Sequence, residues 1–284
     1  MQTQHTDLST PSILVLGGTG KTGRRVIDRL RARDLAVRSG SRSAEPPFDW
    51  EDRHTWEPAL RGAASAYVSF YPDLAVPGAP ETIAAFAEQA VAGGTRRLVL
   101  LSGRGEEEAQ RAEQALQDSG AEWTVVRCSW FMQNFNESYF VEPVAGGELA
   151  LPAGNLAEPF VDADDIADVA VAALTEEGHA GQVYELTGPR ALTFAQAVEE
   201  IGEASGRKVS YLPIPMEAFT SALAEQNAPP EVVDLLRYLF TEVLGRNEHL
   251  SDGVQRALGR QPRDFSDYAR DAAATGVWAR SKVA

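Results

Sequence analysis

Residues 13–23 read ILVLGGTGKTG, an apolar run that leads directly into a cluster of glycines. The next segment, RRVIDRL at 24–30, has the apolar spacing of an amphipathic helix. A strand, a tight turn and a helix in this order place backbone N–H groups and a helix N-terminus against a pyrophosphate. We therefore predict a dinucleotide-binding loop. In this loop Gly17 makes the turn, Gly20 lets the phosphates approach, and Gly23 lets the helix pack closely on the strand.

The glycine spacing is G-x-x-G-x-x-G, and Gly18 is expected to add conformational freedom beside Gly17. The end of the loop, GKT at 20–22, also looks like the end of the phosphate-binding loop of nucleotide triphosphatases. That loop needs a further glycine five positions before Gly20, where this chain has Val15 inside the predicted strand. The sequence thus favours a dinucleotide over a nucleoside triphosphate.

The length, composition and charge of the chain exclude several classes of function. It has 284 residues, 44% of them hydrophobic, and a formal net charge of −15. This composition predicts a globular protein with a sizeable core, and the negative charge opposes binding to nucleic acid or to an anionic membrane surface. No apolar run is long enough to cross a membrane, and residues 1–11 lack the apolar region of a signal peptide. The single cysteine, Cys128, fits a cytoplasmic protein, and the four scattered histidines predict no metal site.

The order of predicted elements indicates the fold class. Strands are expected near 36–42, 64–71, 97–101, 123–127 and 183–187, and helices near 80–91, 106–118 and 163–174. This alternation predicts an α/β fold with a Rossmann-type doubly wound parallel sheet. After residue 188 helices dominate, at 193–205, 215–225, 230–244 and 266–274, with one strand at 209–214. We therefore predict an NAD(P)-binding domain at 11–187 and a smaller, mostly helical lobe at 188–284. This lobe would cover the substrate with help from the loop 128–158.

The end of the second predicted strand bears on the choice of cofactor. A site specific for NAD(H) normally has an acidic residue there, which binds the ribose 2′-hydroxyl. This chain has Ser41 and Arg42 instead, and a guanidinium suits a 2′-phosphate. We predict NADP(H) as cofactor, with Arg42 at the 2′-phosphate. The alternative is an ordinary solvated arginine at a strand end.

Further candidates lie at strand ends, because ligands of parallel sheets bind outside the carboxyl ends of the strands. Ser69, Phe70 and Tyr71 follow the third strand, and Ser102 follows the fourth. In the stretch FDW at 48–50, Asp49 could accept a hydrogen bond from the adenine amine or could equally be a capping carboxylate between two core aromatics. The stretch CSWFMQNF at 128–135 follows the fifth strand and mixes aromatics with amides. It is expected beside nicotinamide and substrate, and the alternative is a packed helix start.

With these residues in view, the chain resembles the NmrA-like group of atypical short-chain dehydrogenase/reductases over nearly its whole length. The resemblance is carried by GGTGKTGR at 17–24, FDW at 48–50, LLS at 100–102, EWTVVR at 122–127, WFMQNF at 130–135 and FVD at 160–162. The opening loop is most similar to the branch of the festuclavine and agroclavine dehydrogenases of ergot alkaloid biosynthesis. The resemblance implies a Rossmann-type fold, NADP(H) binding and reduction of an imine or iminium. The group also contains quinone and dye reductases, and cofactor-binding regulators without known turnover.

The chain departs from the short-chain dehydrogenases at their Tyr-x-x-x-Lys pair. The resemblance aligns these two positions with Gly105 and Ala109, and no Y-x-x-x-K occurs elsewhere. Ordinary carbonyl reduction would lose its proton donor, which contributes about 10²- to 10⁴-fold. Two functions remain. One is hydride addition to an acceptor that develops no strong alkoxide, such as an imine or iminium, a quinone or a conjugated carbonyl. The other is a non-catalytic NADP(H)-binding redox sensor that acts through a protein partner.

The predicted site residues fall into three groups. The cofactor would be held by Gly17, Gly18, Thr19, Gly20, Lys21, Thr22, Gly23, Arg42, Asp49, Ser69, Phe70 and Ser102. The substrate would be framed by Tyr71, Trp130, Phe131 and Asn134. The candidates for a proton donor are Ser102 and Tyr139, and either could instead be a satisfied structural hydroxyl. The sequence leaves open whether the protein forms a homodimer.

Overall fold

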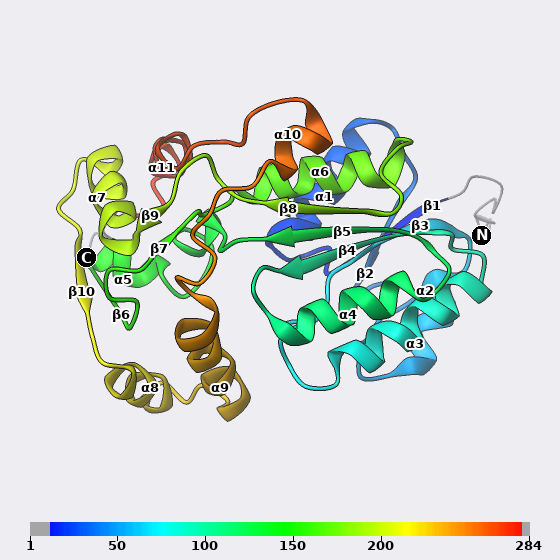
Figure 1. Cartoon of the computed structure of the whole chain (residues 1–284), viewed down its shortest axis with the longest axis horizontal. Coiled ribbons are helices and arrows are strands. Elements are labelled where there is room, and N and C mark those ends of the chain that lie inside the picture. The colour runs from blue at the N-terminus through cyan, green and yellow to red at the C-terminus, as the bar shows by residue number, and fades with distance from the viewer. Residues whose placement is uncertain (1–11, 280–284) are drawn as a thin grey trace, which may run out of the picture. The chain divides into compact units, whose positions relative to one another are not determined.

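Residues 12–279 are described by a computed structural model, shown in Figure 1. They form two units. Unit 1 comprises residues 12–103, 107–127 and 166–184, and unit 2 comprises 104–106, 128–165 and 185–279. The domain bounds predicted from the sequence, 11–187 and 188–284, begin and end outside the described residues and stay a prediction. The polar lead-in at 1–11 also lies outside them.

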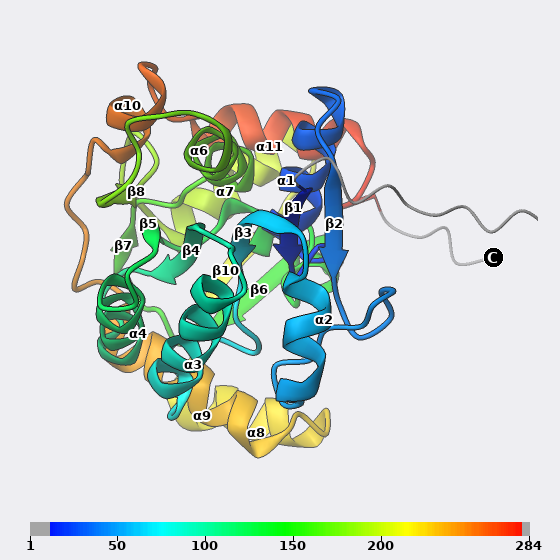
Figure 2. The ribbon, with the colours of Figure 1, turned by 90° about the vertical axis from the view of Figure 1, so that its right-hand side faces the viewer.

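Unit 1 is built on a six-stranded sheet (Figure 2) with the strand order β2-β1-β3-β4-β5-β8. The pairs β1–β2, β1–β3 and β3–β4 are parallel. The strands are β1 (Ser12–Leu16), β2 (Val37–Gly40), β3 (Ala63–Val68), β4 (Arg97–Gly103), β5 (Glu122–Cys128) and β8 (Gln182–Leu186). Buried apolar runs such as ILVL in β1 are typical of parallel strands that are covered on both faces. This sheet confirms the predicted doubly wound α/β fold.

Helices cover both faces of this sheet, as Figure 2 shows, with α3 and α4 on one face and α1 and α6 on the other. Their bounds are α1 (Lys21–Ala32), α2 (Trp56–Leu60), α3 (Ala79–Ala92), α4 (Glu107–Gln117) and α6 (Ala163–Thr175), with a short 3₁₀ turn, η1 (Arg53–Thr55), before α2. Arg29 Nε of α1 donates to Asp168 Oδ1 of α6 at 2.5 Å. The hydrophobic effect stabilises this packing of helices on the sheet, because each helix buries an apolar stripe against it.

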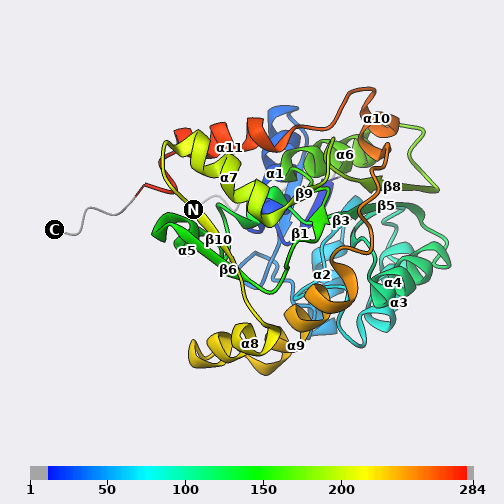
Figure 3. The ribbon, with the colours of Figure 1, turned by 60° about the vertical axis from the view of Figure 1, so that its left-hand side comes forward.

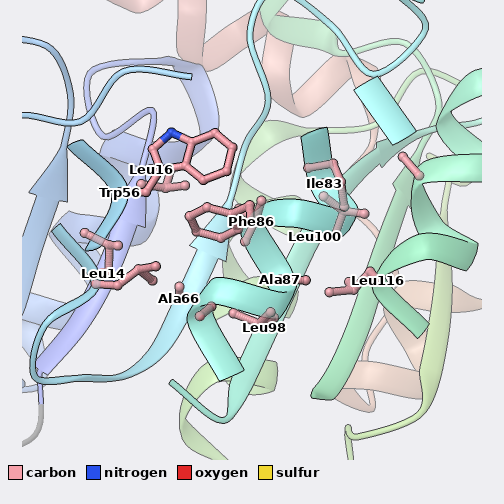
Figure 4. Close-up of a cluster of buried hydrophobic side chains, with 14 of the residues drawn as sticks. Leu14, Leu16, Trp56, Ala66, Ile83, Phe86, Ala87, Leu98, Leu100 and Leu116 are labelled. Atoms are coloured by element: carbon pink, nitrogen blue, oxygen red, sulfur yellow. The ribbon is translucent and has the colours of Figure 1, made fainter. Parts of the chain in front are cut away.

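One part of the core of unit 1 lies between the sheet and the helices α2, α3 and α4 (Figure 4). It contains Leu14, Leu16, Trp56, Ala66, Ile83, Phe86, Leu98, Leu100 and Leu116. The rings of Phe48 and Trp50 pack edge to face at one border of this core, with their centroids 5.0 Å apart. Such aromatic pairs add about 0.5–1.5 kcal/mol beyond the area that they bury. The stretch FDW at 48–50 is therefore anchored by its two aromatic rings.

Unit 2 combines short strands with helices, as the view in Figure 3 shows. Its sheets pair β6 (Glu148–Leu151) with β10 (Ser210–Pro213) and β7 (Ala157–Glu158) with β9 (Leu192–Thr193). Its helices are η2 (Met132–Asn134), α5 (Val141–Gly146), α7 (Phe194–Ser205), α8 (Met216–Glu225), α9 (Pro230–Tyr238), α10 (Gly253–Leu258) and α11 (Phe265–Ala274). Phe135, Phe160, Phe194 and Phe265 form the centre of its core.

Most predicted elements of unit 2 lie within a few residues of their expected bounds, one differs, and α5, α10, β6, β7 and β9 were not predicted. The predicted helix 230–244 ends at Tyr238 and continues as a π-helical turn, Leu239–Val243. The helix α10 was not predicted, because its single turn and a half is too short to show an amphipathic period. The helix α7 begins with a capping box, in which the Thr193 side chain accepts from the Gln196 backbone N–H and the Gln196 side chain accepts from the Thr193 N–H. Within residues 12–279, no helix is both long enough and apolar enough to cross a bilayer.

Candidate functional site

The glycine loop follows β1 and has the geometry expected for a phosphate-binding turn. Gly17 adopts a φ of +65°, which an L-residue with a side chain rarely takes. The Gly20 N–H donates to the Gly17 carbonyl at 2.8 Å and closes the turn. A Cβ at Gly23 would collide with that same Gly17 carbonyl. The helix α1 can therefore approach β1 this closely only with glycine at 23, as the sequence predicts.

Gly18 has a different role from the one expected. Its φ is not positive, so the position needs no special conformational freedom. A Cβ there would instead collide with Ser39 Oγ of β2 and come within 2.6 Å of Ile27 Cδ1 of α1. The expected freedom at Gly18 is therefore wrong, and the physical reason for glycine is the close packing of β2 and α1 around the loop.

The N-terminus of α1 is well suited to bind an anion. Its N-cap residue is Gly20, which has no side chain to accept from the first backbone N–H groups, and the first turn contains no acidic residue. The backbone N–H groups of the first turn and the positive end of the helix dipole thus favour a bound phosphate. A Cβ at Gly20 would meet only the Gly17 carbonyl, at 3.2 Å, and Gly20 is exposed. The residues present fit a dinucleotide pyrophosphate.

The predicted cofactor residues in the first turn of α1 differ in their surroundings. Lys21 is half-buried, whereas Thr22 is buried and its hydroxyl accepts from the Tyr67 hydroxyl at 2.9 Å. This hydrogen bond ties α1 to β3. Thr22 thus has a structural partner in addition to its predicted place near the phosphates, while Thr19 is exposed on the loop.

The end of β3 lies directly against the glycine loop. A Cβ at Gly17 would be 3.3 Å from both Cβ and Oγ of Ser69. The chain leaves β1 toward β2 on one side and returns as β3 on the other, so the loop and Ser69 lie at the point where the strand order reverses. Ligands of open α/β sheets bind at this point. Phe70 is half-buried with its ring 4.9 Å from Trp50, and Tyr71 is 72% exposed.

Two predicted residues lie beyond the end of β2. Arg42 is exposed in the turn after this strand. The Asp49 carboxylate accepts from the Glu51 backbone N–H at 3.1 Å, which is a local turn contact, since the cap of the following turn η1 is Asp52. Arg38 points elsewhere, since its guanidinium donates to Ser12 Oγ at 3.1 Å and to the Arg61 carbonyl at 2.8 Å. Arg38 is thus engaged in contacts within the protein, and the place of Arg42 at the 2′-phosphate stays a prediction.

Ser102 is part of a buried polar network in unit 1. Its hydroxyl donates to Glu113 Oε1 at 2.6 Å, and Ser102 is 5% exposed. Glu113 also accepts from Arg127 Nε at 2.9 Å and from the Arg127 Nη2. Since the hydroxyl proton of Ser102 points at a carboxylate, this geometry argues against Ser102 as a proton donor to substrate.

We expect Ser102→Ala to lower the free energy of unfolding by about 1.5–3 kcal/mol, since it removes a hydrogen bond to a charged group. The affinity for NADPH and kcat should stay near their original values. Urea unfolding, NADPH fluorescence titration and steady-state rates measure the three effects. A large fall in kcat with unchanged stability would support the catalytic role predicted from the sequence.

Three of the four predicted substrate residues, Trp130, Phe131 and Asn134, belong to unit 2, whereas Tyr71 belongs to unit 1. The ring of Trp130 is half-buried and packs 5.0 Å from Phe240 and 5.9 Å from Phe194. Phe131 forms a bridge to Val161, and Asn134 ends the turn η2 (Met132–Asn134). The stretch 130–135 is therefore packed, as the alternative interpretation expects, and Trp130, Phe131 and Asn134 in it are half-buried. Tyr139 is 75% exposed.

The sequence interpretation missed a set of buried charges in unit 2. Arg104 is 4% exposed and donates from Nε to Glu185 Oε1 at 2.6 Å. Its two other nitrogens donate to the carbonyls of Asn247 and His249, at 2.6 and 2.8 Å. Glu158 is 3% exposed and accepts from the Trp130 backbone N–H at 3.4 Å. The position of Arg104 just past a strand end was a usable signal, whereas nothing in the local sequence around Glu158 shows that it is buried.

Burial also affects the ionisation of this set. It raises the pKa of Glu158 to about 7, against the lowering effects of the Trp130 N–H, the Arg104 charge and the Ser129 hydroxyl. Burial likewise raises the pKa of the Cys128 thiol, and the charge of Glu106 adds to this effect. A buried thiol of this kind is a poor nucleophile, so Cys128 is not expected to react.

Comparison with known proteins identifies the relatives of this chain. A model of the NAD(P)H-binding family matches residues 17–177. The uncharacterised oxidoreductase YesF of Bacillus subtilis is 32% identical and covers 94% of this chain and 97% of its own. The NAD(P)H azoreductase of Xenophilus azovorans is 31% identical, with 92% and 98% covered. Festuclavine synthase II of Penicillium roqueforti is 31% identical, with 91% and 97% covered.

Solved structures share the fold at lower identity. Triphenylmethane reductase of a Citrobacter species, complexed with NADP(H), has a TM-score of 0.72 at 19% identity over 92% of this chain and 99% of its own. The NADPH complex of an Escherichia coli quinone oxidoreductase has a TM-score of 0.72 at 21% identity, covering 91% and 99%. The NADP complex of NmrA, a negative transcriptional regulator, has a TM-score of 0.68 at 17% identity, covering 94% and 96%. The matched residues include the glycine loop and the first turn of α1, and the chain belongs to the NAD(P)H-binding family.

Proposed function

We propose that this protein is an NADPH-dependent reductase that passes hydride to a small conjugated acceptor without a Tyr–Lys pair. The acceptor is an imine or iminium, a quinone or a conjugated carbonyl. The observation that carries the proposal is the N-terminus of α1, where the N-cap is a glycine without a capping side chain, the first turn has no acidic residue, and the adjoining loop is exposed. The bound dinucleotide would supply the hydride, and the protein would supply binding, orientation and exclusion of water.

The relatives support this class of acceptor. Those at about 31% identity include an azoreductase and a festuclavine synthase, and a structural neighbour is a triphenylmethane reductase. Azo compounds and triarylmethane dyes share a polarised, conjugated double bond. Hydride addition to such a bond spreads the new charge, or neutralises an existing cation, so it depends less on a strong acid than reduction of a simple ketone does.

The residues of unit 1 would hold the cofactor as follows. Backbone N–H groups around Gly20 and the α1 N-terminus would bind the pyrophosphate. The Arg42 guanidinium would bind the 2′-phosphate. Ser69 and Phe70 would line the trough at the strand-order reversal. In unit 2, the half-buried ring of Trp130 would offer the substrate an apolar surface, with Asn134 as a polar neighbour.

The decisive experiment is NADPH oxidation by the purified protein, run beside NADH with cyclic imines, quinones, triarylmethane dyes and aldehydes. We expect turnover of at least one conjugated acceptor, a preference for NADPH, and little reduction of simple aldehydes. Tight NADPH binding without turnover of any acceptor would contradict the reductase. It would favour instead the non-catalytic sensor, acting through a protein partner, that the likeness to NmrA suggests.

Arg42→Ala tests the choice of cofactor. We expect the affinity for NADPH to fall by about 10- to 150-fold, which corresponds to about 1.5–3 kcal/mol for a charge-assisted contact. The affinity for NADH should hardly change, because NADH has no 2′-phosphate. Fluorescence titration with both nucleotides measures the effect. The matched control is Arg53→Ala, which removes a guanidinium that lies over the Trp56 ring. Equal losses for both nucleotides in Arg42→Ala would contradict the assignment.

A further inference from the structure

Glu158, at the end of β7, is a carboxyl group in surroundings that do not favour its charge. Only 3% of its surface is exposed, its Oε1 accepts from the Trp130 backbone N–H at 3.4 Å, and the Ser129 hydroxyl also favours the charged form. Arg104 offers a positive charge nearby, but three of its nitrogens already donate to Glu185 and to two backbone carbonyls. A carboxyl group in such a place is kept partly protonated, which is the state that donates a proton.

The charged groups around Glu158 come from several parts of unit 2. Arg104 lowers its pKa, and Glu248, from the segment after the π-helical turn, raises it. Burial is the largest effect, and the pKa is raised to about 7. Near neutral pH the group therefore exists in both forms, as general acid catalysis requires.

The place of Glu158 in the fold links it to the predicted substrate residues. Its carboxyl oxygen lies at the backbone of Trp130, and the half-buried ring of this residue is expected to contact substrate. The proton donors considered from the sequence are less suitable. The Ser102 hydroxyl donates to Glu113, and Tyr139 is 75% exposed. At Gly105, the position that the resemblance aligns with the missing tyrosine, φ is +80° and a Cβ would collide with Asn247.

We propose that Glu158 is the general acid of this reductase and protonates a neutral acceptor bound beside Trp130. This inference rests on the proposed reductase function. The acceptor gains two electrons as a hydride at one atom and a proton at the other end of its conjugated bond, while NADPH is oxidised to NADP⁺. The O–H bond of the Glu158 carboxyl breaks as the new bond to the acceptor forms. The carboxylate that remains takes up a proton from water.

A cationic acceptor provides an internal control for this role. A triarylmethane dye takes up hydride alone and becomes neutral, so its reduction needs no proton. A neutral quinone needs both hydride and proton. Loss of the general acid should therefore slow the quinone reaction and spare the dye reaction, whereas damage to the fold or to cofactor binding would slow both.

The experiment compares the full chain with Glu158→Gln, which keeps the size and the acceptor oxygen but holds no acidic proton. The matched control is Asp162→Asn, which changes another buried carboxyl of unit 2. Burial raises the pKa of Asp162 to about 6, and its Oδ1 accepts from Gln133 Nε2 at 3.0 Å. With 1,4-naphthoquinone, kcat should fall about 100-fold or more in Glu158→Gln. With crystal violet it should change less than about twofold, and Asp162→Asn should retain both rates.

Two pH-dependent measurements complete the test. For the original protein, kcat with the quinone should fall as the pH rises through about 7, because the donor loses its proton, and this step should be absent with the dye. Infrared difference spectra without cofactor or substrate should show a protonated carboxyl band that disappears near the same pH. The component of this band that disappears near pH 7 should be missing in Glu158→Gln, which keeps only a component from Asp162 that disappears near pH 6, and it should be present in Asp162→Asn. NADPH titration should give the same affinity in all three proteins.

The outcomes separate the two proposals. If the original protein reduces both acceptors and Glu158→Gln reduces both equally well, Glu158 is not the acid and the reductase stands. Equal losses with both acceptors, or a carboxyl band that titrates near pH 4.5, would also overturn the role of Glu158. If the original protein binds NADPH and reduces neither acceptor nor any member of the wider panel, the reductase itself fails, and the inference fails with it.

Discussion

Replacing Gly23 with alanine is expected to remove NADPH binding and to weaken the fold at once. The added Cβ would collide with the Gly17 carbonyl, so α1 and the loop must move apart. Overpacking of this kind costs about 1–3 kcal/mol of stability. Displacing the loop would also break at least two N–H contacts to the pyrophosphate, each contributing about 1.5 kcal/mol. The affinity for NADPH should therefore fall by about 100-fold or more. Fluorescence titration and urea unfolding measure the two effects.

Two other glycines serve as controls for this variant. At Gly20 the backbone conformation suits alanine, and the Cβ would meet only the Gly17 carbonyl at 3.2 Å. Gly20→Ala should thus keep its stability and still lose NADPH affinity, because the methyl group would occupy the space that the phosphates need. Gly146→Ala, whose Cβ would meet nothing within 4 Å, should change neither quantity. If Gly23→Ala bound NADPH as tightly as the original protein, the loop would not be the pyrophosphate site.

Replacing Arg127 with methionine is expected to give the largest loss of stability, about 3–5 kcal/mol. Glu113 is 1% exposed and receives two donors from Arg127, so the substitution leaves a carboxylate buried without its countercharge. Ser102 alone would remain to bind it. The network joins α4 to β4 and β5, and its loss should lower the midpoint of urea unfolding followed by circular dichroism.

A matched substitution and a double variant make this result specific. Arg111 lies on α4 and is 60% exposed, with Glu107 and Glu108 as partners. Arg111→Met should cost less than about 1 kcal/mol, since exposed ion pairs contribute little. Arg127→Met combined with Glu113→Leu should recover most of the lost stability, because apolar groups can replace a buried ion pair at little cost. A loss in Arg127→Met no larger than that in Arg111→Met would contradict the buried-charge explanation.

Sequence patterns that act within one turn, strand or helix predicted the local structure reliably. The strand, turn and helix around Gly17 and Gly23 were predictable because their determinants lie within about 20 consecutive residues. The helix α7 was equally clear, since Thr193 and Gln196 form a local capping box. The expectation for Gly18 was wrong because the colliding atoms belong to Ser39 and Ile27, which the turn itself does not reveal.

Candidate catalytic groups were harder to predict. Ser102 has the position of a ligand-binding residue at a strand end, yet its hydroxyl donates to Glu113, 11 residues further along the chain. Tyr139 was a candidate by residue type alone, and the structure leaves it 75% exposed. Hydrogen-bond partners and exposure decide whether such a group can donate a proton to substrate. Neither can be predicted from the spacing of residues.

The sequence by itself determined the α/β class, the alternation of strands and helices, and the dinucleotide loop at the start of α1. These follow from apolar periodicity and glycine positions, which act over one turn or one strand. Only the tertiary structure decided the partners of Ser102, the packing role of Gly18, and the burial of Glu158 with its raised pKa. Desolvation and ion pairing depend on atoms that the fold brings together from distant parts of the chain, so local sequence cannot specify them.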